Sequence, residues 1–351
     1  MAISALLTIL GVMLVLLFLG VPISYAIGIS SLSAILAVVP LDVAVLTAAQ
    51  RTFVGMSKFS LTAIPFFILA GNIMNQGGIA KRLVNFVMAI LGKLPGALLV
   101  TNVGTNALFG AISGSASAAA AAVGSMIRDG AEEAGYDPAL TAATNAASAP
   151  SGLLIPPSNA MITYSLAAGG TSVAALFMAG YMPGLIWALA CAVVGVLLAM
   201  KKGYKGTPGK FSWANLGKAT LQAIPSLSLI IVVIGGIIGG IFSATEGSAI
   251  AVVYSLVLAV CYKSINLKSL WKIIVDSAKT SGMVVFLIGV SNILGWVMAF
   301  MQIPDAVAAA LLGLTNNKYL ILLIMNVILL ISGTCCWSDP AERRRRRRES
   351  A

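Results

Sequence analysis

The sequence contains no histidine, and only 9% of its 351 residues are charged. The missing histidine removes the commonest metal ligand of proteins and the commonest general acid–base side chain of enzymes. The charged fraction is far below the roughly 25% that is usual in soluble domains. We therefore expect neither zinc, haem nor histidine-based catalysis, and no soluble globular fold.

Cysteine is scarce as well, with four residues in the whole chain, Cys191, Cys261, Cys335 and Cys336. Their spacing matches no metal-binding motif. Two of them lie inside apolar runs, where a free cysteine behaves as a small hydrophobic side chain. The cysteines give no sign of a metal centre, and we expect no cofactor.

The chain is rich in apolar sequence instead. Hydrophobic residues make up 59% of it, and its mean hydropathy is +0.99. Runs of about 20 apolar residues, the length of a helix that crosses a bilayer, recur along the chain. Two of them fill residues 1–39, on either side of Gly20 and Pro22, and another covers residues 83–100. We expect an all-α, polytopic membrane protein with roughly ten hydrophobic segments, the first of which is a retained helix and not a signal peptide.

The formal net charge of +11 has a topological explanation. Lysine and arginine lie mostly in short loops between apolar runs, as the positive-inside rule describes for cytoplasmic loops. One basic loop covers residues 201–218 and another covers residues 263–272, with two apolar runs between them. Two crossings place both loops on the same side of the membrane. We therefore interpret the charge as membrane topology and expect no nucleic-acid partner.

A cluster of small polar residues interrupts the apolar run at residues 104–127. Ser113, Gly114 and Ser115 follow one another at its centre. Glycine accepts a positive φ and serine can satisfy freed backbone groups, which favours a re-entrant helical hairpin with its tip near the middle of the bilayer. A straight helix packed closely through its small residues explains the same composition. The sequence leaves both interpretations open.

A second interruption lies in the run at residues 139–168. The adjacent Pro156 and Pro157 lack amide donors and force extended backbone before them, so the helix must break there. The freed carbonyl oxygens, with side-chain oxygens from Asn145 and Ser158, suit a hard cation such as Na⁺. A simple proline kink is the alternative. We favour an ion site, because prolines, glycine and polar side chains concentrate between Asn145 and Ser158.

Glu246 is a third candidate, because a carboxylate within a membrane is costly and usually functional. It also follows Ser243 at a spacing that is typical of a helix N-terminal cap, where the helix dipole favours negative charge. We favour the cap and keep a role near the solute path as the minority interpretation.

Taken in order, several stretches resemble a known family. They include IPFFILAGNIMNQGGIAKRL (64–83), GAISGSASAAAAAVGSMI (110–127), GLLIPPSNAMITYSL (152–166) and GIFSATEGSAIAVVYSL (240–256). In these motifs the sequence resembles the large, DctM-like membrane subunit of the tripartite ATP-independent periplasmic (TRAP) transporters. The resemblance covers residues 1–331, which we treat as one transmembrane domain.

The resemblance implies an elevator-type secondary transporter in the bacterial inner membrane. Its coupling ion would be Na⁺, and its solute an organic acid such as a C4-dicarboxylate or sialic acid. A periplasmic DctP-like protein would deliver the solute, and a small DctQ-like membrane subunit would be the partner. By this resemblance Ser113, Gly114 and Ser115 form the tip of the first hairpin. The broken helix that faces the tip carries Asn145, Ile155, Pro156, Pro157 and Ser158, and the Na⁺ candidates are Ser113, Asn145, Pro156 and Ser158.

The C-terminal end departs from the family pattern. Ser332-Gly333-Thr334 resembles the start of a second hairpin and Asp339-Pro340-Ala341 echoes its opening, but six arginines, Arg343–Arg348, follow. Such transporters are built from inverted repeats, so the second repeat is incomplete here. We interpret residues 332–351 as an aberrant basic tail from a truncated or frame-shifted reading. A genuine tail that binds anionic lipid is the rival interpretation.

Two other functions compete with transport. A non-transporting assembly or structural membrane subunit is plausible, because the second half-site is missing. An intramembrane enzyme would need a nucleophile with a base. Ser113 has no histidine partner, and Lys93 is the only basic residue deep in an apolar run near the candidates, so a Ser–Lys dyad has little support. We expect a transport subunit and no enzyme.

Overall fold

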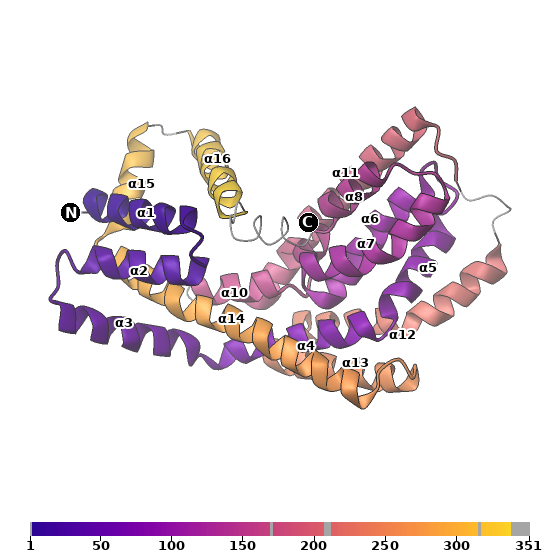
Figure 1. Cartoon of the computed structure of the whole chain (residues 1–351), viewed down its shortest axis with the longest axis horizontal. Helices are drawn as coiled ribbons and strands as arrows, with labels where there is room; N and C mark the ends of the chain where they lie inside the picture. Colours follow the sequence, from indigo (N-terminus) through magenta and orange to yellow (C-terminus); the bar gives the residue numbers. More distant parts are fainter. Residues whose placement is uncertain (1, 169–170, 207–211, 315–316, 338–351) are drawn as a thin grey trace. The chain divides into compact units, whose positions relative to one another are not determined.

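The computed structural model describes residues 2–168, 171–206, 212–314 and 317–337, and for residues 166, 167, 311, 314 and 331–337 it describes the backbone alone. Every regular element in these ranges is a helix, which confirms the all-α prediction (Figure 1). The arginine run Arg343–Arg348 and the motif at Asp339 lie outside the described residues.

The chain divides into two compact units, which are described separately. The terminal unit combines Met1–Lys58 with Met283–Ala351, and the central unit is Phe59–Gly282. The terminal unit contains α1 (Ala2–Phe18), α2 (Ile23–Ile35), α3 (Leu41–Met56), the second half of α14 (Leu267–Phe300), α15 (Ile303–Leu314) and α16 (Lys318–Trp337).

The terminal unit has its own apolar core. The chain turns between α1 and α2 at Gly20, which adopts a φ of 80°, and Pro22 precedes the first turn of α2. This confirms the two apolar runs that the sequence predicts on either side of these residues. Side chains from α1, α2, α3, α14 and α15 then pack together, among them Ile9, Ile35 and Val297. These contacts bury the inner face of each helix.

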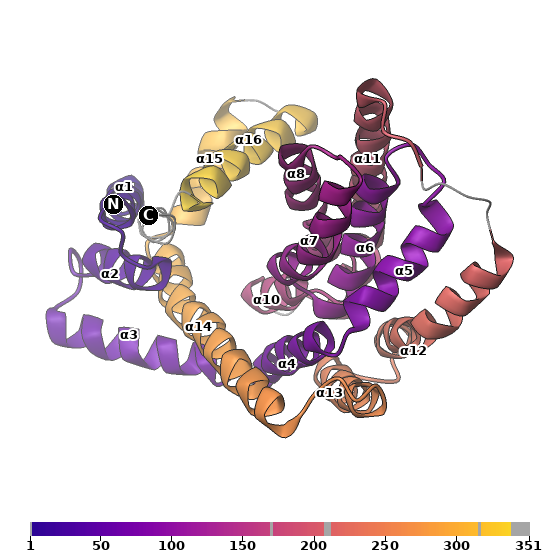
Figure 2. The same ribbon diagram turned by 45° about the vertical axis from the view of Figure 1, so that its right-hand side comes forward.

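The central unit is built around α6. Its helices are η1 (Phe59–Thr62), α4 (Ala63–Gln76), α5 (Ile79–Leu91), α6 (Ala97–Ser113), α7 (Ala116–Glu133), α8 (Pro138–Ser148), α9 (Ser151–Leu154), α10 (Asn159–Ala167), α11 (Val173–Lys202), α12 (Trp213–Ile238), α13 (Ala244–Cys261) and the first half of α14. Thirteen of the seventeen residues of α6 are buried, so this helix lies inside the unit. It contacts α4, α5, α7, α8, α9 and α11 (Figure 2).

One predicted segment is divided in the structure. Residues 83–100 are predicted as a single apolar run, but α5 ends at Leu91 and α6 begins only at Ala97. Pro95 carries no amide hydrogen, and Gly96 adopts a left-handed φ of 70° before α6. The pair Pro95-Gly96 is an ordinary turn signal. The continuous-run interpretation was therefore wrong at this point.

The lengths of the helices fit a membrane protein. Within the described ranges α11, α12, α13 and α14 are each long and apolar enough to cross a bilayer, and α3 followed by η1 and α4 gives a fifth candidate if counted as one interrupted span. α1, α2, α6 and the first part of α16 are shorter apolar helices. A helix of twelve residues such as α15 is about 18 Å long, well short of a hydrocarbon core of about 30 Å.

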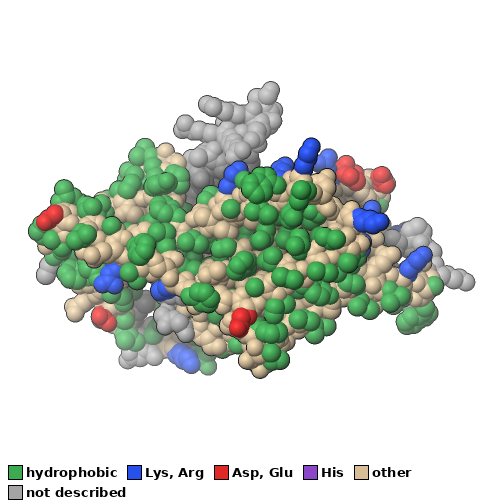
Figure 3. Space-filling model, turned by 90° about the horizontal axis from the view of Figure 1, so that it is seen from below, with side chains coloured by type: hydrophobic (Ala, Val, Ile, Leu, Met, Phe, Trp, Pro, Cys, Tyr) green, Lys and Arg blue, Asp and Glu red, His purple; other side chains and the backbone are tan. Residues whose placement is uncertain are grey.

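The surface supports the same conclusion. Figure 3 shows a face on which hydrophobic side chains dominate and charged side chains are few. On α11 and α12, Leu189 is 64% exposed and Ile231 is 72% exposed. Monomeric soluble proteins rarely expose such extended apolar surfaces, whereas lipid covers them at no cost. The chain is a multi-pass membrane protein.

Candidate functional site

The chain reverses direction at the Ser113–Ser115 cluster. α6 ends at Ser113, and Gly114 adopts a left-handed φ of 64° while its amide donates to the Gly110 carbonyl over 2.7 Å. Ser115 then starts α7, because its hydroxyl accepts the Ala118 amide at 3.3 Å. Glycine is the usual residue in a left-handed C-terminal cap, and serine is common as an N-terminal cap. The two helices therefore form a hairpin, and the straight-helix alternative does not apply.

The paired prolines interrupt the helix that follows. α9 ends at Leu154, Ile155 and Ser158 both have extended backbone, and α10 begins at Asn159. The peptide between the two prolines is cis. Because neither proline has an amide hydrogen, the carbonyl groups four residues before them, in α9, lose their helical partners. This part of the chain is a helix break and not a mild kink.

The tip of the hairpin lies directly against the helix break. A methyl group on Gly114 would lie 3.0 Å from the Pro157 carbonyl oxygen and 3.4 Å from the Asn159 amide nitrogen. A side chain here would push the two segments apart by a few tenths of an ångström and would also strain the left-handed backbone. The hairpin tip (residues 113–115) and the helix break (residues 155–158) are thus brought together from separate parts of the sequence.

Two buried polar atoms without partners lie at this meeting point. Ser158 has no exposed surface, and its hydroxyl has no hydrogen-bond partner among the described residues. The side-chain carbonyl oxygen of Asn159 is also buried and has no hydrogen-bond partner in the described part of the chain. Ser113 is 3% exposed, and within the described ranges its hydroxyl reaches only the Ser115 backbone, at 3.4 Å. Buried polar groups in native proteins normally have partners, and a bound ion or solute would supply them here.

Further glycines hold the surrounding helices close. A methyl group on Gly152 of α9 would lie 2.3 Å from the Gly110 Cα of α6, and one on Gly180 of α11 would lie 2.6 Å from the Leu154 carbonyl oxygen. On α4, a methyl group on Gly71 would lie 3.0 Å from the Ser113 carbonyl oxygen. These helices therefore fix the tip and the break at backbone-to-backbone distances.

Asn145 contacts the body of the hairpin, not its tip. Its amide nitrogen donates to the Ala120 carbonyl of α7 at 2.8 Å, and its side-chain oxygen accepts from Asn106 of α6 at 3.0 Å. Asn106 precedes Gly114 by eight residues, about 12 Å along the helix. The structure thus brings Ser113, Gly114 and the helix break together and gives Asn145 a separate set of partners.

The sequence analysis missed a buried polar cluster that includes these partners. The amide nitrogen of Asn106 lies 2.9 Å from the side-chain oxygen of Asn102 and 2.8 Å from the Ser148 hydroxyl. Asn102, Asn106 and Ser148 have no exposed surface. The pattern Thr101-Asn102 followed by Thr105-Asn106 repeats at a spacing of four, which places both asparagines on one helix face. That spacing was the available signal.

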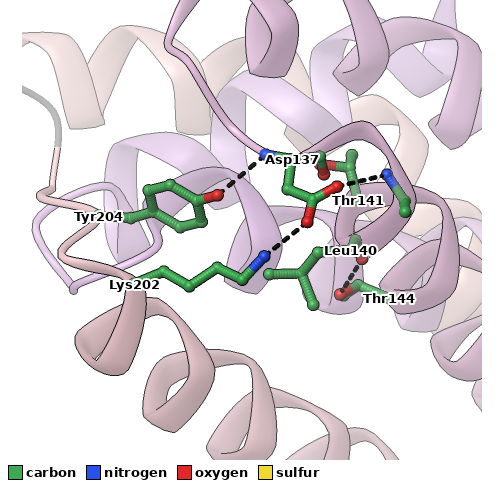
Figure 4. A network of polar contacts seen from close by, with 7 residues as sticks. Asp137, Leu140, Thr141, Thr144, Lys202 and Tyr204 are labelled. Carbon is green, nitrogen blue, oxygen red and sulfur yellow. Dashed lines mark hydrogen bonds and ion pairs between the residues drawn. The ribbon is translucent and has the colours of Figure 1, made fainter.

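A charged contact fixes the start of α8 to the end of α11 (Figure 4). The Lys202 ammonium lies 2.5 Å from Asp137, whose other carboxylate oxygen accepts the Ala139 amide at 2.9 Å. The Tyr204 hydroxyl accepts the Asp137 amide at 2.9 Å. The hydrogen bond from Lys202, and after it the one from the Ala139 amide, hold the pKa of the Asp137 carboxyl below its ordinary value. This contact anchors the broken helix at its first residue.

Glu246 has the structural role that the sequence analysis favours. The Ser243 amide donates to its carboxylate at 2.7 Å, and the Glu246 amide donates to the Ser243 hydroxyl at 3.2 Å. This reciprocal pair is a capping box at the start of α13. A role for Glu246 near the solute path stays a prediction.

Oxygen atoms are the available cation ligands. Within the described ranges, no three His, Cys, Asp or Glu residues are close enough together to hold a metal ion. A cation at the hairpin tip would therefore be bound by backbone carbonyl and hydroxyl oxygens, which hard cations prefer. The first turn of α10 has amide groups without helical partners, since no side chain caps this helix, and such N–H donors suit an anion and not a cation.

Comparison with known proteins places the chain in one family. The family model of the tripartite ATP-independent periplasmic transporter, DctM component, matches residues 10–337. The chain is 49% identical over 306 residues to the uncharacterized protein YgiK of Salmonella typhimurium. This alignment covers 87% of the chain and 70% of the relative. It is 37% identical to the isethionate TRAP transporter permease protein DctMQ of Oleidesulfovibrio alaskensis, covering 86% of the chain but 47% of that relative.

A third relative is the C4-dicarboxylate TRAP transporter large permease protein DctM of Rhodobacter capsulatus. The identity is 37% over 317 residues, covering 86% of the chain and 71% of the relative. The relatives named as TRAP permeases are transport proteins, which confirms that a transporter and not an enzyme should be expected. The chain belongs to the DctM family of tripartite ATP-independent periplasmic transporter components and is a membrane transport subunit.

Proposed function

We propose that this chain is the large membrane subunit of a Na⁺-coupled secondary transporter that imports an organic acid across the bacterial inner membrane. The observation that carries the proposal is the contact between the hairpin tip and the helix break, with the buried, unpartnered hydroxyl of Ser158 beside it. Discontinuous helices of this kind form the ion and solute sites of secondary transporters.

The coupling ion would lie where oxygen atoms converge. Ser113 and Ser158 supply hydroxyl oxygens, and α9, just before the helix break, supplies the carbonyl oxygens released by Pro156 and Pro157. Asn145 would act by holding α8 against the hairpin, since both polar atoms of its side chain already have partners. A small hard cation is the ligand that such a set of neutral oxygens favours.

The solute would be an anion held by the start of α10. This helix begins at Asn159, beside Gly114, and no side chain caps its first turn. Free amide groups and the positive end of the helix dipole favour a carboxylate there. The names of two relatives, a C4-dicarboxylate permease and a sialic acid permease of Vibrio cholerae, refer to carboxylic acids. An organic acid is therefore the solute class that we propose.

Two protein partners follow from membership of the family. The family description names a tripartite periplasmic transporter, of which DctM is one component. We infer that a small DctQ-like membrane subunit and a DctP-like periplasmic binding protein supply the other two. The binding protein would deliver the organic acid to the membrane.

Uptake into proteoliposomes tests this function. The chain is reconstituted with its small subunit and binding protein, and uptake of radiolabelled succinate and sialic acid is measured under a Na⁺ or a K⁺ gradient. We expect uptake of an organic acid only with Na⁺ and only with the binding protein. Uptake that is equal under both gradients would contradict Na⁺ coupling. Na⁺ binding without any uptake would favour the assembly subunit instead.

A pair of serine variants locates the ion site within the same assay. Ser158→Ala removes an unpartnered buried hydroxyl and should raise the Na⁺ concentration for half-maximal uptake by at least about tenfold. Ser30→Ala is the control, because Ser30 is equally buried but its hydroxyl bonds the Ile27 carbonyl of its own helix at 3.0 Å. The control should keep the Na⁺ dependence of the unchanged chain.

A further inference from the structure

A polar cavity lies in the central unit, apart from the hairpin tip. It has a volume of about 560 Å³ and is lined by residues from the start of α5, from α12 and from the segment after α13. Figure 2 shows where the helices α5, α12 and α13 run. We call this cavity the basic cavity, and its polar side chains come from Lys81, Arg82, Asn85, Gln222, Tyr262 and Ser264. The volume falls within the range of roughly 300–1,000 Å³ that is usual for small-ligand sites.

The two positive charges of the basic cavity have no counter-ion among the described residues. The ion pairs of this part of the chain involve neither Lys81 nor Arg82. The sequence contains no Asp or Glu at residues 59–128 or 207–245, so α4, α5 and α12 carry no negative side chain. Like charges collected in a cleft raise the local concentration of anions. The basic cavity should therefore attract a negatively charged group.

The Arg82 side chain is held in position by an aromatic ring. Its guanidinium carbon lies 3.3 Å from the centre of the Tyr262 ring, a cation–π contact. The Tyr262 hydroxyl is buried and has no hydrogen-bond partner within the described ranges. Buried hydroxyl groups normally have a partner, so this donor stays unpaired unless a small shift of the ring brings it to a ligand oxygen in the cavity.

Backbone amides add to these donors. Gly78 enters α5 with a left-handed φ of 69°, and no side chain caps the helix. The amides of the first turn therefore lack helical partners and carry the positive end of the helix dipole. Gly77, Gly78 and Lys81 line the basic cavity, so the start of α5 forms part of its wall.

We propose that the basic cavity binds a phosphate group. A phosphate offers several oxygens in a compact arrangement, which matches an arginine fork, a lysine, a tyrosine hydroxyl and free amides better than a single carboxylate does. The group has two sources, a phospholipid headgroup and free phosphate. A lipid fits one further feature: Leu221 lines the same cavity and is 71% exposed, which offers apolar surface to an acyl chain next to the charges.

Lipid and phosphate titrations of the purified chain in detergent separate these sources. Thermal unfolding is followed with increasing phosphatidylglycerol, with dioleoylglycerol as a lipid that lacks phosphate, and with potassium phosphate against potassium chloride at equal ionic strength. Stabilisation by phosphatidylglycerol alone would identify a lipid headgroup. Stabilisation by inorganic phosphate, with or without the lipid, would identify a site for the free anion. Equal effects of phosphatidylglycerol and dioleoylglycerol, with none from phosphate, would overturn the proposal.

Substitutions assign the effect to the basic cavity. Lys81→Gln and Arg82→Gln should each raise the half-saturating concentration of the stabilising phosphate compound by at least about tenfold. Tyr262→Phe keeps the ring under Arg82 and should raise it by a smaller factor. Lys201→Gln, which removes the same charge at the end of α11, should leave it unchanged. Unchanged half-saturation in both Lys81→Gln and Tyr262→Phe would overturn the proposal even if Arg82→Gln failed to fold.

Discussion

Gly152 offers a direct test of how closely the helices beside the site must approach. A methyl group on this residue would lie 2.3 Å from the Gly110 Cα and 2.8 Å from the Asn106 carbonyl oxygen. The shorter distance falls 1.1 Å below the 3.4 Å at which ordinary van der Waals contact begins. Because both obstacles are backbone atoms, no side-chain rotation can relieve the clash. In Gly152→Ala, α6 and α9 must therefore move apart.

The size of the effect follows from this geometry. Overpacking a well-packed interior costs about 1–3 kcal/mol, and a backbone clash should lie at the upper end, about 3 kcal/mol. α9 leads straight into the helix break, so its displacement should also weaken Na⁺ binding. Equilibrium unfolding of the purified chain in mixed micelles, followed by tryptophan fluorescence with and without Na⁺, measures both effects.

Gly217→Ala is the matched control. Gly217 lies in α12, and a methyl group on it would have nothing within 4 Å, so alanine should stabilise the helix by up to about 1 kcal/mol. The two glycine substitutions should therefore change the free energy of unfolding in opposite directions. Equal stability of Gly152→Ala and the unchanged chain would refute the close packing of α6 on α9.

Three further predictions concern the same region. Gly114→Ala should lower the free energy of unfolding by about 1–2 kcal/mol, because alanine strains the left-handed backbone, and it should also weaken Na⁺ binding. Gly135 is the control, because it has a φ of 75° but open space around it. In unfolding and Na⁺ titrations Gly135→Ala should therefore show the backbone cost alone. The pKa of Asp137 is lowered in the folded chain, so its contribution to stability should be complete above about pH 4 and be lost as the pH falls through that lowered value. In acid unfolding, Asp137→Asn should lack this pH-dependent loss of stability. The control Asp129→Asn should keep it. Asn106→Ala should lower the free energy of unfolding by about 1–3 kcal/mol, because it leaves buried oxygens and hydroxyls without a donor; a change below about 0.5 kcal/mol would contradict this role.

Local signals made the hairpin and the helix break predictable from the sequence. A serine–glycine–serine cluster encodes a left-handed C-terminal residue followed by a helix cap, and Gly114 and Ser115 have those conformations. Adjacent prolines cannot donate helical hydrogen bonds, so the break at Pro156 and Pro157 needs no tertiary information. The same reasoning applied to Pro95-Gly96 would have separated α5 from α6.

Contacts between distant segments were beyond such reasoning. Asn145 was predicted on the broken helix that faces the hairpin, but its partners, Ala120 and Asn106, could be identified only from the packing of α8 on α6 and α7. Arg82 and Tyr262 are 180 residues apart in the numbering, so no sequence pattern joins them over a common cavity. Periodicity and turn chemistry locate elements, whereas site composition depends on which elements pack together.

Direct binding of ²²Na⁺ to the purified chain tests the central claim, that the hairpin tip and the helix break together hold a cation. We predict saturable binding that Ser158→Ala weakens by at least about tenfold and Ser30→Ala leaves unchanged. Binding with the same affinity in Ser158→Ala as in the unchanged chain would contradict the claim.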